Sequence, residues 1–135
     1  MKKIILDTNF LMIPYKFRVD IFSELTRVCN FSYKLYIFEQ SINELKNIIK
    51  KQSGMDKKSA RFALKLIGLK NIDIIKSAQE DVDSLILNNL DKDTVIATLD
   101  IRLKKEVLKK GASVIILRQK KYLQIILGVK SSYVC

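Results

Sequence analysis

The sequence predicts an α/β fold in which helices flank a parallel β-sheet. Segments with the pattern of strands alternate with segments that have the apolar periodicity of helices, and such alternation is typical of parallel sheets covered by helices. Hydrophobic residues make up 48% of the chain, which has one proline and four glycines, so we expect an ordered chain. No repeat, linker or low-complexity tract divides the sequence. We therefore expect one domain that spans residues 1–135.

The chain opens with a strand and a helix. Residues 2–6 form a short apolar strand that ends at Asp7, and the lone proline, Pro14, interrupts the segment that follows. Asp20 is predicted to be the N-cap of a helix that continues through Val28, because aspartate accepts hydrogen bonds from the first free N–H groups of a helix. The apolar residues of this segment recur at helical spacing.

A second strand, two helices and a third strand follow. Residues 33–38 are aromatic and β-branched, which favours a strand. Ser41 is predicted to cap a helix with apolar residues at 42, 45, 48 and 49, and Asp56 to cap the next helix. The apolar residues of that next helix are Ala60, Ala63, Leu64 and Ile67. Residues 72–75 form a short third strand.

The last part of the chain repeats the alternation. We expect a helix at 81–90, a strand at 94–99, a helix at 101–110 and a buried strand at 114–117. Gly111 is predicted to be the residue just past the second of these helices, since glycine readily adopts the left-handed conformation that ends a helix. The predicted sheet therefore has five strands.

Two predicted strands deliver an aspartate to the same edge of this sheet. Asp7 follows the first strand and Asp100 follows the fourth. In an open parallel sheet, ligands bind just outside the carboxyl ends of the strands. Two carboxylates there indicate an acidic pocket, and an acidic pocket suggests a hard divalent cation. Taken singly, either aspartate could equally be a helix cap.

Two acids on helices are predicted to complete this pocket. Glu44 lies about 40° from Ile48 on its helical wheel, at the border of the apolar face. Asp83 lies about 60° from the apolar direction of the helix at 81–90, whereas Asp81 lies about 140° away and faces water. Carboxylates that approach one another repel and raise one another's pKa values, and a divalent cation relieves that repulsion.

The composition excludes several kinds of chemistry. The chain has no histidine, which excludes imidazole acid–base catalysis and the Ser-His-Asp and Cys-His triads. No glycine-rich phosphate loop is present. Cys29 and Cys135 lie far apart and are too few ligands for zinc, and this cysteine usage favours a cytoplasmic location. No segment has the pattern of a signal peptide or a membrane-spanning helix, so we expect no membrane partner.

The net charge of +11, from 25 Lys+Arg against 14 Asp+Glu, favours a polyanionic partner. Lysine-rich surfaces also occur in proteins of hot-growing organisms, but there glutamate rises together with lysine. An acidic, metal-ready site on a cationic protein indicates a nuclease. The cations expected to hold the nucleic acid follow Asp100 and the last strand, and they are Arg102, Lys104, Lys105, Arg118, Lys120 and Lys121.

Five segments of the chain resemble motifs of PIN-domain nucleases. They are Ile-Leu-Asp-Thr-Asn (5–9), Ile-Asn-Glu-Leu (42–45), Val-Asp-Ser-Leu-Ile (82–86), Ala-Thr-Leu-Asp (97–100) and Val-Ile-Ile-Leu-Arg-Gln-Lys-Lys-Tyr-Leu (114–123). The last segment is similar to archaeal PIN proteins of the VapC-like and Fcf-like groups. The resemblance spans nearly the whole chain. It implies a three-layer α/β/α sandwich with a central parallel five-stranded sheet, and an endoribonuclease that depends on Mg²⁺ or Mn²⁺.

The resemblance also implies a role for individual residues. The acidic quartet that holds the metal would be Asp7, Glu44, Asp83 and Asp100. Thr98 would be the small hydroxyl residue beside the quartet, and Asn9 would support the nearby acid. Leu99 departs from the pattern, because many relatives have a polar residue there. The implied reaction is hydrolysis of RNA, most readily single-stranded RNA.

Partners follow from the same resemblance. An antitoxin protein is expected if the chain is the toxin of a toxin–antitoxin pair, and none if it is an RNA-processing factor. A homodimer is expected as well, formed through apolar residues predicted to be exposed around Ile21, Phe22 and Leu25.

Three rival interpretations were weighed against a ribonuclease. A catalytically weak RNA-binding module of the same fold would share the charge and the architecture. A phosphoryl-transfer receiver domain also has acids at strand ends, but it requires an aspartate after the mid-chain strand, where this chain has Glu39. Flap-type DNA nucleases are much longer chains. The receiver and flap-nuclease interpretations therefore fit poorly.

Overall fold

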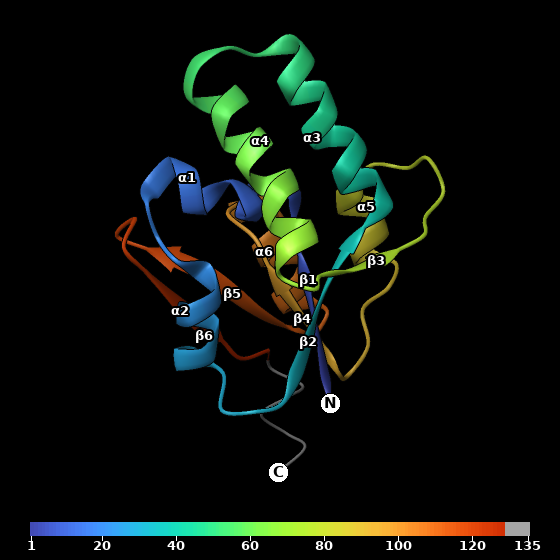
Figure 1. The fold of residues 1–135 in the computed structure, drawn as a ribbon. Helices are drawn as coiled ribbons and strands as arrows, with labels where there is room; N and C mark the ends of the chain where they lie inside the picture. The colour runs from blue at the N-terminus through green and yellow to red at the C-terminus, as the bar shows by residue number, and fades with distance from the viewer. Residues whose placement is uncertain (129–135) are drawn as a thin grey trace.

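A six-stranded sheet lies at the centre of the structure, a computed structural model that describes residues 1–128 (Figure 1). Its strands are β1 (Lys2–Leu6), β2 (Tyr33–Phe38), β3 (Asp73–Ile75), β4 (Thr94–Ala97), β5 (Ser113–Arg118) and β6 (Tyr122–Ile126). They lie side by side in the order β3-β2-β1-β4-β5-β6, and all neighbours are parallel except β5 and β6. The predicted domain, residues 1–135, extends to residues 129–135, which lie outside the described residues.

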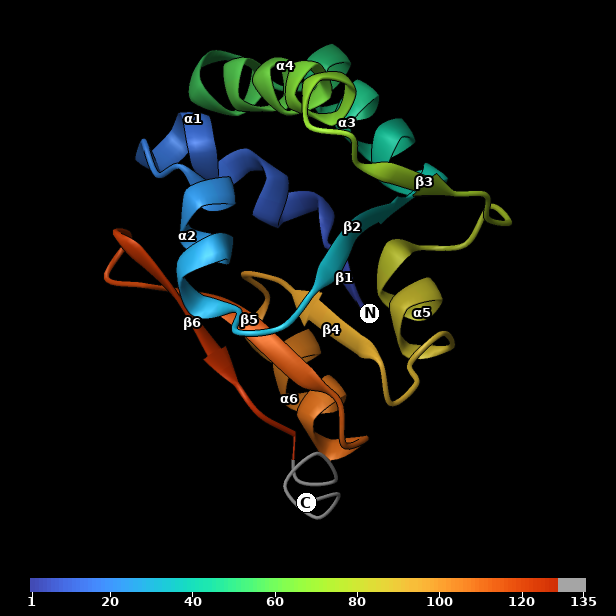
Figure 2. The ribbon, with the colours of Figure 1, turned by 60° about the horizontal axis from the view of Figure 1, so that its bottom comes forward.

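Helices cover both faces of the sheet (Figure 2). They are the 3₁₀ helix η1 (Thr8–Met12) and the α-helices α1 (Ile13–Phe17), α2 (Ile21–Val28), α3 (Glu39–Lys51), α4 (Gly54–Leu69), α5 (Val82–Leu87) and α6 (Ile101–Lys109). Helices η1 and α1–α4 pack on the face that contains Ile4 and Leu6, and α5 and α6 pack on the face that contains Ile5. Successive residues of β1 thus supply two cores, because side chains alternate along a strand. The predicted α/β/α sandwich is confirmed.

The order of the strands reverses between β1 and β4, and we call the region outside the carboxyl ends of these two strands the crevice. After β1 the chain adds β2 and β3 on one side, and it then crosses to the other side of β1 for β4 and β5. Ligands of open α/β sheets bind at such a reversal, outside the carboxyl ends of the strands. Leu6 is paired with Ala97 at these ends. Asp7 and Thr98, the next residues of the two strands, therefore emerge beside each other.

Strand β6 extends the five predicted strands by one antiparallel edge strand. It is joined to β5 by a tight turn in which Gln119 and Lys120 have φ values of 52° and 55°. Turns of this kind normally contain asparagine, aspartate or glycine. Without those residues the sequence carries no turn signal here, and the sequence-based prediction of five parallel strands describes β1–β5 only.

Two predicted caps are confirmed and two are wrong. Asp20 caps α2 by accepting hydrogen bonds from the backbone N–H groups of Phe22 and Ser23, and Gly111 has a φ of 92° just past α6. Ser41 does not cap a helix, because β2 runs directly into α3 and Ser41 is buried inside that helix. Asp56 is a first-turn residue of α4, whose N-cap is Ser53.

The prediction that apolar residues of α2 are exposed and available for a dimer interface is also wrong. Ile21 and Leu25 are fully buried, because α2 packs against the unpredicted strand β6, and Phe22 is only partly exposed. Among residues 1–128, no helix has both the length and the apolar character needed to cross a membrane.

A candidate active site at the crevice

Asp7 occupies the crevice directly after β1. Its backbone N–H donates to Ala97 O at 2.9 Å, which continues the β1–β4 pairing by one residue. Its carboxylate is held at both oxygens: Oδ2 accepts from Thr98 Oγ1 at 2.7 Å, and Oδ1 accepts from the backbone N of Thr8 at 2.8 Å. Only 5% of the residue is exposed. Asp7 is therefore a rigidly positioned carboxylate with little contact to water.

Burial makes the carboxyl group of Asp7 a weaker acid than an exposed aspartate. The pKa of its carboxyl is raised to about 6, chiefly by removal from water and in addition by the negative charges of Asp83 and Glu44, although the hydrogen bonds from Thr98 and Thr8 act in the opposite direction. A carboxylate that is desolvated and repelled in this way is stabilised by a nearby cation. The electrostatics therefore fit a cation-binding role at Asp7.

Glu44 is tied to the same crevice through Thr8. The hydroxyl of Thr8 donates to Glu44 Oε1 at 2.5 Å and lies 2.9 Å from Ser41 Oγ. Thr8 and Ser41 are buried, whereas Glu44 is half-buried. The three side chains join η1 to α3, so the position of Glu44 depends on the residue that follows Asp7.

Thr98 and Asn9 shape the connection from β4 to α6. Thr98, which is 1% exposed, donates to Asp7 and accepts from the backbone N–H of Asp100 at 3.0 Å. Asn9 Oδ1 accepts from the backbone N–H of Leu99 at 3.2 Å. Asn9 therefore supports the loop that carries Asp100 instead of bonding to Asp7.

Asp100 is the N-cap of α6. Its Oδ1 accepts from the backbone N–H groups of Arg102 and Leu103 at 2.9 and 3.2 Å. The cap role that the sequence left open is thus real for Asp100, and Asp7 likewise caps η1. Capping uses one oxygen of Asp100 and leaves Oδ2 available for another ligand.

Asp83 lies on the first turn of α5, on the acidic side of the crevice. Partial burial raises the pKa of its carboxyl, and repulsion from Asp100, Asp81 and Glu106 adds to this. Asp81 differs: it caps α5, and hydrogen bonds from the side chain and backbone of Ser84 lower its pKa. Both aspartates are exposed, so the helical-wheel distinction is not one of surface exposure; they differ in the direction in which their pKa values are shifted.

The four predicted acids lie close enough for their negative charges to repel one another in pairs, but they do not form a closed metal-binding site. Asp7 is repelled by Glu44 and Asp83, and Asp83 by Asp100. Within residues 1–128, no three acidic or cysteine side chains converge closely enough to enclose a metal ion. Mg²⁺ usually keeps several waters and binds through one or two carboxylates, so this open donor set suits it better than a dedicated cage would.

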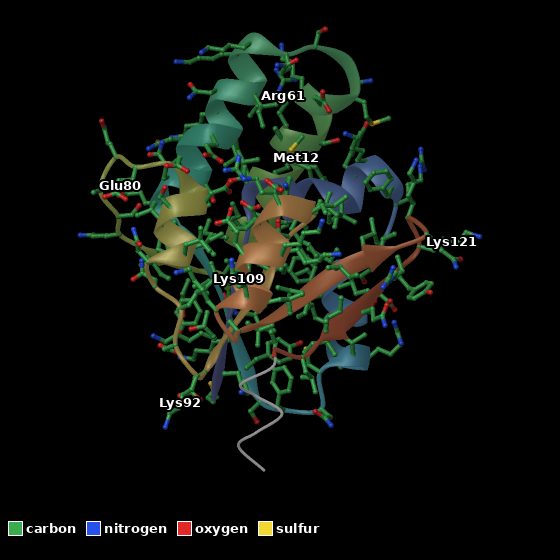
Figure 3. All side chains as sticks on the ribbon, turned by 180° about the vertical axis from the view of Figure 1, so that it is seen from behind. Met12, Arg61, Glu80, Lys92, Lys109 and Lys121 are labelled. Atoms are coloured by element: carbon green, nitrogen blue, oxygen red, sulfur yellow. The ribbon has the colours of Figure 1, made fainter. Side chains whose placement is uncertain are left out.

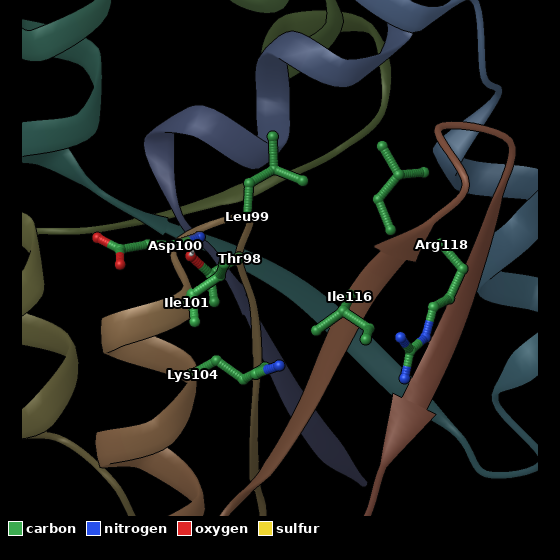
Figure 4. A pocket seen from close by; sticks show the side chains of 8 residues that line it. Thr98, Leu99, Asp100, Ile101, Lys104, Ile116 and Arg118 are labelled. Carbon is green, nitrogen blue, oxygen red and sulfur yellow. Dashed lines mark hydrogen bonds between the residues drawn. The ribbon is translucent and has the colours of Figure 1, made fainter.

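The predicted cations divide among three places. Lys104 and Arg118 line a cavity of about 200 Å³ beside Asp100, where Figure 4 shows both side chains extending into the same hollow. Arg102 is paired with Glu106 at 3.4 Å, and Lys105 is exposed on the same helix. Lys120 lies over the ring of Phe17, and Lys121 projects at the tip of the β5–β6 hairpin (Figure 3).

Sequence reasoning missed two members of the crevice. It gave Thr8 no role and assigned Ser41 to a cap, whereas both hydroxyls are buried beside Glu44. The available signal was the position of Thr8 between Asp7 and Asn9, where a short hydroxyl side chain immediately follows a strand-end acid.

The fold that carries these strand-end acids agrees with the known proteins to which this chain is similar. Residues 4–120 match the family described as "PIN like domain". This chain belongs to the PIN-like domain family. The PIN-like chain is 29% identical to ribonuclease VapC4 of Methanocaldococcus jannaschii over 127 residues, which cover 93% of this chain and 97% of that protein. It is also 29% identical to ribonuclease VapC9 of Archaeoglobus fulgidus over 118 residues, covering 87% and 84% of the two chains.

A solved structure shares the architecture of this PIN-like domain. The structure of the PIN domain endonuclease Utp24 superposes with a TM-score of 0.77 at 19% identity and covers 94% of both chains. This likeness establishes the fold. Together with the two archaeal relatives, it confirms the resemblance to VapC-like PIN proteins that the sequence motifs predict.

Proposed function

We propose that this PIN-like domain is an endoribonuclease that hydrolyses RNA phosphodiester bonds with the help of Mg²⁺ or Mn²⁺. The observation that carries the proposal is the environment of Asp7, a buried carboxylate whose pKa of about 6 reflects desolvation together with repulsion from Asp83 and Glu44. Such an environment is unfavourable for an anion unless a cation occupies it. RNA as the substrate is supported by the name ribonuclease that both archaeal relatives carry.

The donor set fits a hard cation. Asp7 and Asp100 would hold it directly, and Glu44 and Asp83 would bind it directly or through water, because oxygen ligands and retained waters are what Mg²⁺ prefers. A bound divalent cation supplies Lewis acidity and lowers the pKa of a coordinated water. Thr98 orients Asp7 through its hydrogen bond, and Thr8 orients Glu44. We assign no separate general base.

The test is cleavage of labelled single-stranded RNA by the purified chain, in Mn²⁺ or in EDTA. We expect cleavage that requires the metal and is lost in Asp7→Asn, Glu44→Gln, Asp83→Asn and Asp100→Asn. Glu80→Gln is the matched control, because Glu80 is an exposed acid on the loop before α5 (Figure 3). Cleavage that survives EDTA or Asp7→Asn would come from a contaminant and would refute the proposal.

The alternative is an RNA-binding module with a weak or vestigial site. The open donor set of the described residues, without a closed three-acid cage, is compatible with this alternative as well. A binding module would retain RNA affinity in all four acid variants and would not be stabilised by Mg²⁺. The ribonuclease should instead show a higher melting temperature in Mg²⁺ than in NaCl of equal ionic strength, and Asp7→Asn should abolish the difference.

The biological setting follows from the VapC-like resemblance. We propose that the chain acts in the cytoplasm as the toxin of a toxin–antitoxin pair, with an antitoxin protein as its partner and RNA as its substrate. An RNA-processing factor is the second candidate. Growth arrest on expression of the wild-type chain, absent for Asp7→Asn, is expected of a toxin. A homodimer stays a prediction, and it now requires a face other than the buried side of α2.

A further inference from the structure

We propose that the cavity beside Asp100 binds one unpaired nucleotide of the RNA strand, with its phosphate between Lys104 and Arg118 and its base against Leu99, Ile101 and Ile116. The inference rests on RNA being the substrate, as proposed above, and it identifies where a nucleotide next to the acidic crevice is held. The cavity is lined by the residues that follow β4, by residues of α6 and by the last residues of β5.

The two cations reach this cavity from different elements. Lys104 comes from α6 and Arg118 from the end of β5, and Figure 4 shows their charged ends extending toward the same hollow. Two positive charges that face one hollow repel each other, and an anion between them removes that repulsion. The carboxylate of Asp100 is directed away from the charged ends of Lys104 and Arg118 (Figure 4). The hollow itself is therefore suited to a phosphate.

Arg118 is held in a conformation that leaves its terminal nitrogens free for a ligand. Its Nε donates to Gln124 Oε1 at 2.6 Å, so strand β6 fixes the plane of the guanidinium group. A guanidinium group oriented in this way can donate two parallel hydrogen bonds to a phosphate. Lysine at position 118 would keep the charge but lose this geometry.

The hairpin that supplies Gln124 is built at an energetic cost. Gln119 and Lys120 both adopt left-handed backbone conformations, which are unfavourable for residues other than glycine, asparagine and aspartate. Strained turns persist where the surrounding structure or a function requires them. Here the turn returns the chain so that β6 lies beside β5, with Gln124 paired to Ile116. The strained turn thus places Gln124 where it can orient Arg118.

Four of the side chains that line the cavity are apolar, which a phosphate alone would not require. Ile101 is 64% exposed at the start of α6, directly after Asp100, and Leu99 and Ile116 lie on the same cavity. Apolar side chains beside two cations match a nucleotide, whose base has apolar faces and whose phosphate is charged. A base already paired in a duplex could not turn its face toward these side chains.

The size of the cavity favours one unit of a polymer over a free small molecule. Its volume of about 200 Å³ is below the ~300–1,000 Å³ that is usual for small-molecule sites. Because Asp100 borders both the cavity and the acidic crevice, a strand held here would continue directly toward Asp7.

The test measures binding without cleavage. A labelled single-stranded oligoribonucleotide is titrated in EDTA with the wild-type chain and with Lys104→Ala, Arg118→Lys, Arg118→Gln and Ile101→Ser, and melting temperatures verify folding. Lys109→Ala is the matched control, because Lys109 is exposed at the opposite end of α6, about 12 Å along the helix from its start.

We expect Lys104→Ala and Arg118→Gln to weaken binding about tenfold and to reduce the salt slope of log K by about 0.7 each, as loss of one phosphate contact requires. Arg118→Lys should weaken binding less and leave the salt slope unchanged. Ile101→Ser should weaken binding about fivefold at an unchanged slope, the signature of a lost base contact. Lys109→Ala should stay within about twofold of wild type, and duplex RNA should compete poorly.

Several outcomes would overturn the inference. Pocket variants that bind like Lys109→Ala would exclude the phosphate site, and an unchanged Ile101→Ser would exclude the base contact. Equal competition by a duplex would exclude the requirement for an unpaired nucleotide, and a wild-type chain that does not bind the oligoribonucleotide at low salt would exclude the site altogether. Cleavage by the wild-type chain with pocket-independent binding refutes only this inference. Pocket-dependent binding without any cleavage refutes only the ribonuclease.

Discussion

Thr98 donates a 2.7 Å hydrogen bond to Oδ2 of Asp7 across the gap between the ends of β4 and β1. The same hydroxyl accepts a hydrogen bond from the backbone N–H of Asp100. One buried side chain therefore fixes the carboxylate at one strand end and the start of the helix that carries the next acid. The relative position of Asp7 and Asp100 therefore depends on this hydroxyl.

Thr98→Val should separate the hydroxyl from the shape of the side chain. The hydrogen bond from Thr98 lowers the pKa of Asp7, so its removal raises that pKa further and moves the acid limb of the pH–activity profile to higher pH. A hydrogen bond to a charged group contributes about 1.5–3 kcal/mol, so activity near pH 6 should fall at least about tenfold. Thr98→Ser keeps the hydroxyl and should retain the wild-type profile. Identical profiles for the two variants would contradict the role of the bond.

The contribution of Asp7 to the stability of the metal-free protein should decrease as pH rises. The pKa of Asp7 is about 6 in the folded chain and about 3.9 in an unfolded chain. Between these values the folded state binds more protons, so the free energy of unfolding falls as pH rises from about 4 to about 6. The full effect is about 3 kcal/mol, from a pKa difference of about two at 1.36 kcal/mol each.

Urea unfolding in EDTA at pH 4 to 7.5 measures this effect, with Asp7→Asn as the comparison. The variant cannot ionise at this position, so it should gain stability relative to wild type as pH rises and should be the more stable protein at pH 7. A difference between the two proteins that does not change with pH would show that Asp7 titrates normally in the folded chain.

Thr8→Val should test whether Glu44 needs to be held. The substitution removes the hydrogen bond from Thr8 to Glu44 and the contact with Ser41, so Glu44 becomes free to leave the crevice. Residues that orient a metal ligand typically change metal affinity by about 10- to 100-fold. The Mn²⁺ concentration at half-maximal cleavage should rise by about that factor, whereas Thr8→Ser should behave as wild type. A loss of thermal stability without a change in Mn²⁺ dependence would reduce Thr8 to a packing role.

The strand-end acids were predictable because topology, and not local preference, brings them together. Alternating strands and helices place Asp7 and Asp100 at the carboxyl edge of a parallel sheet, and the structure brings Thr98 into contact with both. The helical wheel separated Asp83 from Asp81 by its 3.6-residue period, but both residues are exposed in the structure and differ only in the direction of their pKa shifts. Whether the four acids together hold a metal stays a prediction.

The errors share a different cause, because they concern residues whose roles depend on an unpredicted neighbour. Ser41 has the local preferences of a cap, but β2 enters α3 without a loop, so its hydroxyl faces Thr8 instead. Strand β6 follows a turn without glycine or asparagine, so it gave no signal. Ile21 and Leu25 were expected to be exposed, but α2 packs against the unpredicted strand β6 and both residues are buried.

Strand β6 lies at the edge of the sheet, and two side chains of α2 form hydrogen bonds with backbone groups at this edge. Glu24 Oε1 accepts from the backbone N–H of Leu123 at 2.9 Å, and Arg27 donates to the carbonyl oxygen of Leu123 at 2.8 Å. Glu24 and Arg27 also pair with each other at 2.9 Å. Because β6 carries Gln124, which orients Arg118, this clamp connects α2 to the proposed nucleotide pocket.

Glu24→Ala should open the clamp, lower the melting temperature by about 2–5 °C and weaken oligoribonucleotide binding through Arg118. Hydrogen bonds from Arg27 and from the backbone of Leu123 lower the pKa of Glu24, so its contribution is present above the ordinary pKa and is lost as pH falls through the folded-state value. The difference in melting temperature from wild type should therefore shrink below about pH 4. Thr26→Ala, an exposed neighbour on α2, is the control. If Glu24→Ala melts earlier but binds RNA normally, the hairpin keeps Arg118 in place without the clamp.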